Sequence, residues 1–103
     1  MLTIYTAKTF FARLIGLLGK SNLPPDEALL IPHCMGVHTW FMRFPIDVVW
    51  LDWQNKVIEI QANLGPWRVA RGPKGTVACL ELAEGGAGKH ALFVGNDIAS
   101  LLN

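Results

Sequence analysis

The polar residues that could do chemistry lie close together, within residues 34 to 52, which read CMGVHTWFMRFPIDVVWLD. His38, Arg43 and Asp47 interrupt a pattern that is otherwise apolar and aromatic. A neutral imidazole both accepts and donates protons near pH 7, and a carboxylate binds hydrogen-bond donors. This mixture is typical of a binding or catalytic site, because a purely structural hairpin would not need these polar groups.

His38 has two readings. Alternation along an extended strand places it on one face with Gly36, Trp40 and Met42, and places Arg43 on the other face. In the functional reading, the imidazole is a ligand or a general base. In the structural reading, which is the commoner situation, it is a core or rim histidine with its hydrogen bonds satisfied.

Two further carboxylates face an apolar environment. Asp47 shares a strand face with Val49 and Leu51, so an ionised carboxylate there must be paired or hydrogen-bonded. We favour a structural role for Asp47, as acceptor of loop N–H groups or partner of an arginine, over a role in gripping a ligand. Glu81 poses the same burial problem. Asp52 begins a turn, and a turn residue is its simplest interpretation.

His33, Cys34 and His38 are ligand types that zinc uses, but their spacing is not that of a zinc motif. We predict no metal and no cofactor, and keep a three-ligand site with Asp47 or Glu81 as an alternative. A Cys34 nucleophile activated by His38 ranks below this alternative, because the sequence shows no oxyanion hole.

Four tryptophans could pack in the core or form a binding surface. Trp50 lies in a strand that is apolar on both sides, which assigns it to the core. Trp67 and Arg68 lie beside the glycine-rich segment 71–75, and we expect Trp67 to be exposed. Aromatic rings next to cations are enriched at protein interfaces, so this segment is a candidate interaction surface.

The remaining pattern predicts a mainly β protein. Residues 9–18 have apolar side chains at helical spacing and predict the one clear helix, whereas the glycines of residues 84–90 favour a loop. Strands are expected at residues 2–6, 28–31, 36–43, 46–52, 56–62 and 76–82, and a closing hairpin at 93–101. Residues 36–43 and 46–52 should form the central pair. We therefore expect a compact antiparallel β sandwich or barrel-like single domain, residues 1–103, with one or two short helices.

Composition excludes several function classes. The chain has 103 residues, 51% of them hydrophobic, and a formal charge of +1, so nothing favours nucleic acid or anionic lipid as a partner. We see no signal peptide or membrane-spanning run, and expect a cytoplasmic protein. Cys34 and Cys79 should be reduced there, with a disulfide only in an oxidising compartment.

The segment HTWFMRFPIDVVWLD resembles the most distinctive motif of the DUF192 (UPF0127) family. Its surroundings agree along nearly the whole chain, except that Leu18 and Cys79 depart from the commoner pattern. The resemblance implies a compact, mainly antiparallel β fold and no known activity. A link to pilus or secretion components is implied by this resemblance alone. The matching segments are RLIGLL at 13–18, LGPW at 64–67, LEL at 80–82 and GND at 95–97.

We therefore interpret the chain as a binding or accessory module for a protein or a small-molecule ligand. The alternative is a small metal-dependent or His/carboxylate hydrolase using His38, Asp47 and Glu81, and the sequence leaves open whether there is catalysis. Convergence of these three side chains in an open cleft would favour the enzyme. The candidate ligand-binding residues are His38, Arg43, Asp47, Trp67, Arg68 and Glu81.

Overall fold

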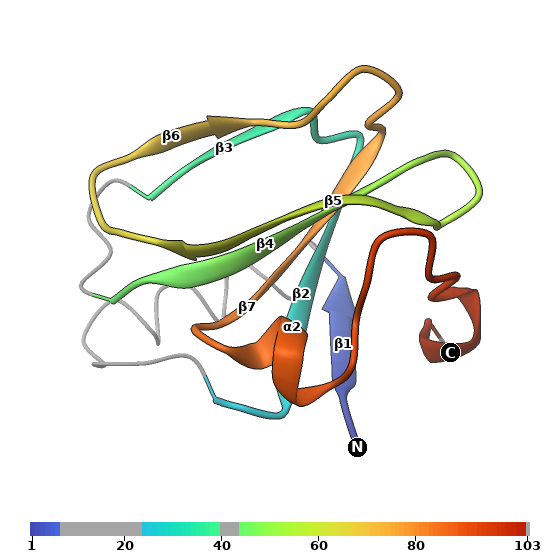
Figure 1. The fold of residues 1–103 in the computed structure, drawn as a ribbon, viewed down its shortest axis with the longest axis horizontal. Coiled ribbons are helices and arrows are strands. Elements are labelled where there is room, and N and C mark those ends of the chain that lie inside the picture. The colour runs from blue at the N-terminus through green and yellow to red at the C-terminus, as the bar shows by residue number, and fades with distance from the viewer. Residues whose placement is uncertain (7–23, 40–43, 103) are drawn as a thin grey trace.

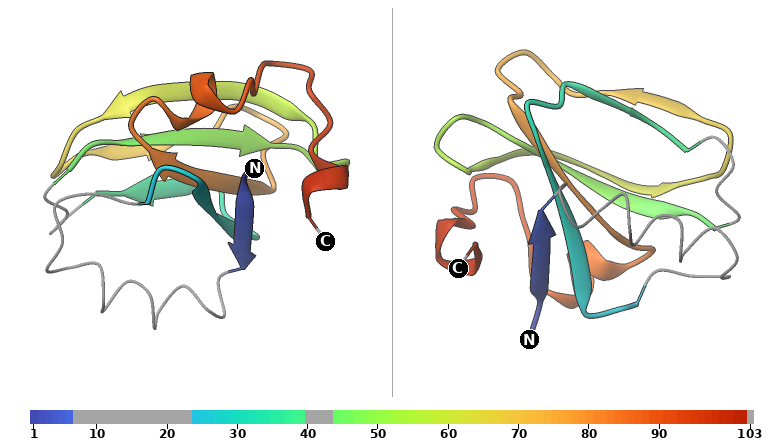
Figure 2. Two further views of the ribbon diagram at one scale, coloured as in Figure 1. Left: turned by 90° about the horizontal axis from the view of Figure 1, so that it is seen from below. Right: turned by 180° about the vertical axis from the view of Figure 1, so that it is seen from behind.

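A five-stranded sheet forms the centre of the molecule (Figure 1). The structure, a computed structural model, describes residues 1–6, 24–39 and 44–102. The strands pair in the order β1-β2-β7-β4-β5, all antiparallel except β1 with β2. Seen from behind in Figure 2, β1 lies beside β2 at the edge of this sheet. The strands are β1 (Thr3–Thr6), β2 (Glu27–Pro32), β4 (Ile46–Leu51), β5 (Val57–Leu64) and β7 (Ala78–Ala83).

The strands β4 and β7 are buried along their whole length. Both have apolar residues on each face, with a single acid in each, Asp47 and Glu81. A strand that is apolar on both sides needs a layer of structure on each face of the sheet. The two strands pair antiparallel, with Val48 opposite Glu81 and Asp47 opposite Leu82.

A separate two-stranded sheet covers one face. It consists of β3 (Gly36–His38) and β6 (Val69–Arg71), and Figure 1 shows the pair lying apart from β4 and β5. Residues 36–43 and 46–52 were expected to form a central hairpin, and this expectation is wrong for the described part. Here β3 pairs with β6, and β4 lies between β5 and β7. Sequence adjacency favoured the hairpin, but the apolar β4 takes the most buried position instead.

Each face of the main sheet has its own apolar core. One core lies between the main sheet and the β3–β6 pair, and we call it the plate-side core. It includes Val37, Ile46, Val48, Trp50, Ala70 and Cys79. The helix-side core lies on the opposite face under α2 (Gly86–Lys89), and it includes Val49, Leu51, Leu80, Leu82, Ala87 and Ile98. Alternation along β4 and β7 therefore sends successive side chains into different cores.

The chain after β7 contains little regular structure. The expected loop at residues 84–90 is wrong in part, because Gly86–Lys89 form the short helix α2 despite their glycines. The expected closing hairpin is absent from the described residues. Instead, Asp97 makes one isolated bridge to Lys56, and residues Ala99–Leu101 form the 3₁₀ helix η1. The predicted helix at residues 9–18 lies outside the described residues. Among those described, no helix has the length and apolar character needed to cross a membrane.

Candidate functional site

Asp47 is a buried carboxylate held by two backbone donors. Its side chain is 1% exposed. One oxygen accepts the N–H of Asn63 at 2.9 Å, and the other accepts the N–H of Ala87 at 3.1 Å. The β4–β5 register shifts between Ile46 and Val48, which places Asp47 beside this irregularity. These contacts tie β4 to β5 and to α2, as the structural interpretation of Asp47 requires.

Glu81 lies on the opposite face of the same strand pair. It is 6% exposed and points into the plate-side core, because it follows the alternation of Cys79 and is opposite Val48. Among the described residues, no group donates a hydrogen bond to its carboxylate. Burial raises the pKa of Glu81 to about 7. The group is therefore a protonatable carboxyl near neutral pH, without a fixed partner in the described part.

The hydrolase set is not brought together. Asp47 and Glu81 point to opposite faces of the sheet, and His38 is on β3 with an exposed side chain. Arg43 lies outside the described residues. Within the described ranges, no three His, Cys, Asp or Glu side chains are close enough to share a metal ion. Asp52 accepts the N–H groups of Gln54 and Lys56 at 2.8 and 2.9 Å, which fits its interpretation as a turn residue.

His38, Trp67 and Arg68 do lie on one surface. We call β3, β6 and their flanking segments, residues 33–39 and 65–77, the outer plate. Its inner face contributes Val37 and Ala70 to the plate-side core. The side chains that point away from this core are exposed. They include the cations Arg68, Arg71 and Lys74 and the apolar residues Met35, Trp67 and Val69.

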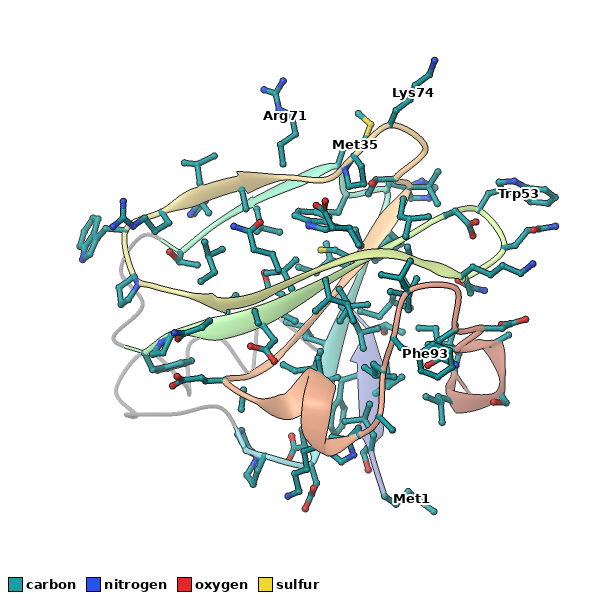
Figure 3. The ribbon with its side chains drawn as sticks, viewed as in Figure 1. Met1, Met35, Trp53, Arg71, Lys74 and Phe93 are labelled. Atoms are coloured by element: carbon teal, nitrogen blue, oxygen red, sulfur yellow. The ribbon has the colours of Figure 1, made fainter. Side chains whose placement is uncertain are left out.

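The outer plate has an unbalanced charge. It contains three of the nine Lys and Arg residues and none of the eight Asp and Glu residues, so the rest of the chain has six cations against eight acids. Figure 3 shows Arg71 and Lys74 extending away from the molecule, with Met35 nearby. Arg71 and Lys74 also line an open depression of about 640 Å³. Cations are therefore not offset by acids within the outer plate, although the whole chain is nearly neutral.

Trp67 adopts an unusual backbone conformation. Its φ is 62°, in the left-handed region, and its side chain is 61% exposed. Pro66 precedes it, and a turn with Pro first and a positive-φ residue second normally has glycine at the second position. A bulky residue in this region costs roughly 1–2 kcal/mol. An exposed aromatic side chain at a strained backbone position indicates a role in binding a partner.

Thr39 holds this turn in place, a role that the sequence pattern did not predict. It is fully buried, and its hydroxyl donates to the carbonyl of Gly65 at 2.6 Å and accepts the N–H of Arg68 at 2.9 Å. Its carbonyl accepts the N–H of Trp67 at 3.0 Å. A buried Thr amid apolar residues was the available signal, because such a hydroxyl needs partners.

The loop from Gly72 to Thr76 is packed closely against the main sheet. A Cβ on Gly72 would lie 2.8 Å from the ring of Trp50 and 2.5 Å from the hydroxyl of Thr76, so glycine is required there. Trp50 is fully buried, as predicted, and Trp67 is exposed, as predicted. Trp53, which had no assignment, is 76% exposed in the β4–β5 turn.

The fold and this surface define a small, mainly β domain with an exposed, cationic and aromatic plate. The family model DUF192, described as Uncharacterized ACR, COG1430, matches residues 1–100. The chain belongs to the DUF192 family. The resemblance found in the sequence is thereby confirmed.

Two UPF0127 proteins of Thermococcus species are similar in sequence to this chain. The chain is 29% identical to the UPF0127 protein TK1120 of Thermococcus kodakarensis over 93 residues, which cover 77% of the chain and 59% of that protein. It is 30% identical to a UPF0127 protein of Thermococcus gammatolerans, covering 77% of the chain and 60% of that protein. The chain thus spans about 60% of the length of these relatives.

A solved structure has the same fold. A protein of unknown function from Novosphingobium aromaticivorans superimposes with a TM-score of 0.70 at 20% sequence identity. The match covers 91% of this chain and 70% of that protein. At this identity the similarity establishes the fold and leaves the activity to be argued from the site.

Proposed function

We propose that the protein is a binding module whose outer plate docks an acidic protein segment that also has apolar side chains. The observation that carries this proposal is that the plate exposes cations and large apolar groups together and contains no acid. Protein interfaces are enriched in Arg, Trp and Met, and depleted in Lys and acids at their centres. Trp67 and Arg68 have the residue types that dominate binding energy in such surfaces.

Charge complementarity identifies the partner class. Arg68, Arg71 and Lys74 attract carboxylates and accelerate the encounter with an acidic surface. Trp67 and Val69 offer apolar area, 61% and 70% exposed, that a purely ionic ligand would leave in water. A protein segment with both acidic and apolar side chains would satisfy both features.

The test uses a labelled synthetic peptide of mixed glutamate and leucine, with a glutamine-for-glutamate peptide as its control. Fluorescence anisotropy with the purified full chain measures the dissociation constant. We expect binding of the acidic peptide only, and weaker binding as salt rises, because exposed charges are screened over about 8 Å at physiological ionic strength.

Two matched charge reversals locate the site. Arg71→Glu on the outer plate should weaken binding by about tenfold, which corresponds to ~1.4 kcal/mol. Lys56→Glu, an exposed cation in the β4–β5 turn, changes the net charge equally and should leave the affinity within about twofold. Equal losses in both variants would mean that binding follows net charge and not the outer plate. Equal affinity for both peptides would reject the acidic partner.

A further inference from the structure

Two cysteine side chains meet where the outer plate joins the main sheet. Cys34 lies in the crossover from β2 to β3, and Cys79 is the second residue of β7. Their Sγ atoms are 3.4 Å apart, and both are free thiols. The Cys34 thiol also donates to the carbonyl of Gly36 at 3.0 Å. Residues separated by 45 positions in the sequence thus form a thiol pair at the junction of two layers.

The backbone holds the two cysteines next to each other. The N–H of Cys34 donates to the carbonyl of Val77 at 3.0 Å, and Ile31 pairs directly with Cys79 in the β2–β7 ladder. Between these two attachments the chain turns at His33, which has a φ of 54°. Because neither attachment involves sulfur, the thiols remain neighbours when no bond joins them.

We propose that Cys34 and Cys79 form an oxidisable pair that a low-molecular-weight disulfide, such as glutathione disulfide, converts into an intramolecular cross-link. A protein disulfide has its sulfur atoms about 2.0 Å apart. From the 3.4 Å contact, the sulfurs must therefore approach by roughly 1.4 Å, which is within reach of side-chain rotations.

The difference in burial sets the order of the steps. Cys34 is half-buried, whereas Cys79 is buried, so the oxidant meets Cys34 first. The Cys34 thiolate attacks one sulfur of glutathione disulfide, the S–S bond breaks, and one glutathione leaves as a thiolate and takes a proton from water. Cys79 then gives its proton to water, attacks the Cys34 sulfur and expels the second glutathione. The protein thiols lose two electrons, and the oxidant becomes two glutathione thiols.

The second step should be slow and should accelerate as pH rises. Burial raises the pKa of the Cys79 thiol, and the neighbouring Cys34 and Glu81 raise it further. Only the thiolate attacks a disulfide, so a raised pKa reduces the reactive fraction at neutral pH. Once formed, the bond would join the crossover that enters the outer plate to the central strand β7.

The experiment treats the reduced protein, residues 1–103, with excess glutathione disulfide, quenches with acid and measures the intact mass. The wild type should pass through a species with one added glutathione and end with a loss of two hydrogen atoms. Cys79→Ser should stop at the added glutathione, and Cys34→Ser should stay largely unmodified while folded. The cross-linked wild type should melt higher by on the order of 10 °C.

The wild-type mass alone decides the proposal, so it stays testable if a variant does not fold. A wild type that ends with one bound glutathione, or with none, would overturn it. So would a cross-link that forms only when denaturant is added, because the folded structure would then not bring the thiols together. The outcome is independent of peptide binding to the outer plate.

Discussion

Asp47 and Glu81 are two buried acids on neighbouring strands that differ in their hydrogen-bond partners. Both are more than 90% buried, and both interrupt strands that are apolar on each face. Asp47 points to the helix side and accepts two backbone N–H groups. Glu81 points to the plate side, where no described group donates to it, and its pKa rises to about 7.

The difference shows that two equally buried carboxyl groups can differ in the hydrogen-bond donors that reach them. Desolvation disfavours the carboxylate, while hydrogen bonds to the carboxylate favour it. Asp47 lies beside an irregular β4–β5 register and the first turn of α2, where backbone donors are available. Glu81 lies in a regular ladder, whose backbone donors are used by neighbouring strands. Local backbone irregularity therefore supplies the donors that a regular sheet lacks.

The largest expected effect concerns the pH dependence set by Glu81. In the unfolded chain this group titrates near 4.5, whereas in the folded protein it titrates near 7. Between these values the unfolded state binds fewer protons, so the free energy of unfolding falls as pH rises. The shift predicts a loss of about 3 kcal/mol between pH values below 4.5 and above 7.

Glu81→Gln removes this titration and isolates it from other groups. The variant should gain stability relative to the wild type as pH rises from 4.5 to 7, by up to about 3 kcal/mol. Urea unfolding at several pH values measures the difference. A constant difference across this range would show that Glu81 keeps the same pKa in the folded and unfolded states, and the predicted pH dependence would be wrong.

The second effect concerns the donors around Asp47. Asp47→Ala leaves the N–H groups of Asn63 and Ala87 without their acceptor in a buried place. Each unpaired donor costs roughly 1–3 kcal/mol, and a net loss of ~2 kcal/mol lowers the melting temperature by about 8–16 °C. Asp47→Asn keeps one acceptor oxygen, so its melting temperature should lie between those of Asp47→Ala and the wild type. If Asp47→Ala melts at or above the wild-type temperature, the structural role is wrong and Asp47 becomes a ligand candidate.

Much of the sheet could be predicted from local pattern. The strands β2, β5 and β7 follow from apolar runs bounded by glycine, proline and asparagine, and the burial of Trp50 follows from a strand that is apolar on both sides. These features depend on neighbours in the sequence, so one sequence suffices to find them.

Pairing across the chain was harder to predict. The partner of β3 is β6, more than thirty residues away, and adjacency pointed to β4 instead. The contact between Cys34 and Cys79 has the same origin, since it requires the β2–β7 register and the turn at His33. Side-chain periodicity gives the face of a residue but not the strand that will lie beside it. The part of the site that depends on such pairing therefore needed the structure.

The smallest expected effect on stability concerns Trp67. This prediction distinguishes a residue that serves binding on the outer plate from one that stabilises the main sheet. Removing a residue that the fold needs should destabilise the protein, as removing Asp47 should. Trp67 instead has a positive φ that glycine adopts at little cost, and the residue is 61% exposed. Trp67→Gly should therefore melt at the wild-type temperature or slightly above it, within about 1 kcal/mol of added stability.

The same variant should bind the acidic peptide about tenfold more weakly, because an exposed aromatic anchor is lost. Trp53→Gly is the matched control, since Trp53 is 76% exposed, lies off the outer plate and has no positive φ. It should lose roughly 0.5–1 kcal/mol of stability through added backbone freedom and keep its affinity. A clear loss of stability in Trp67→Gly with unchanged peptide binding would make Trp67 a structural residue. The outer plate would then depend on its cations alone.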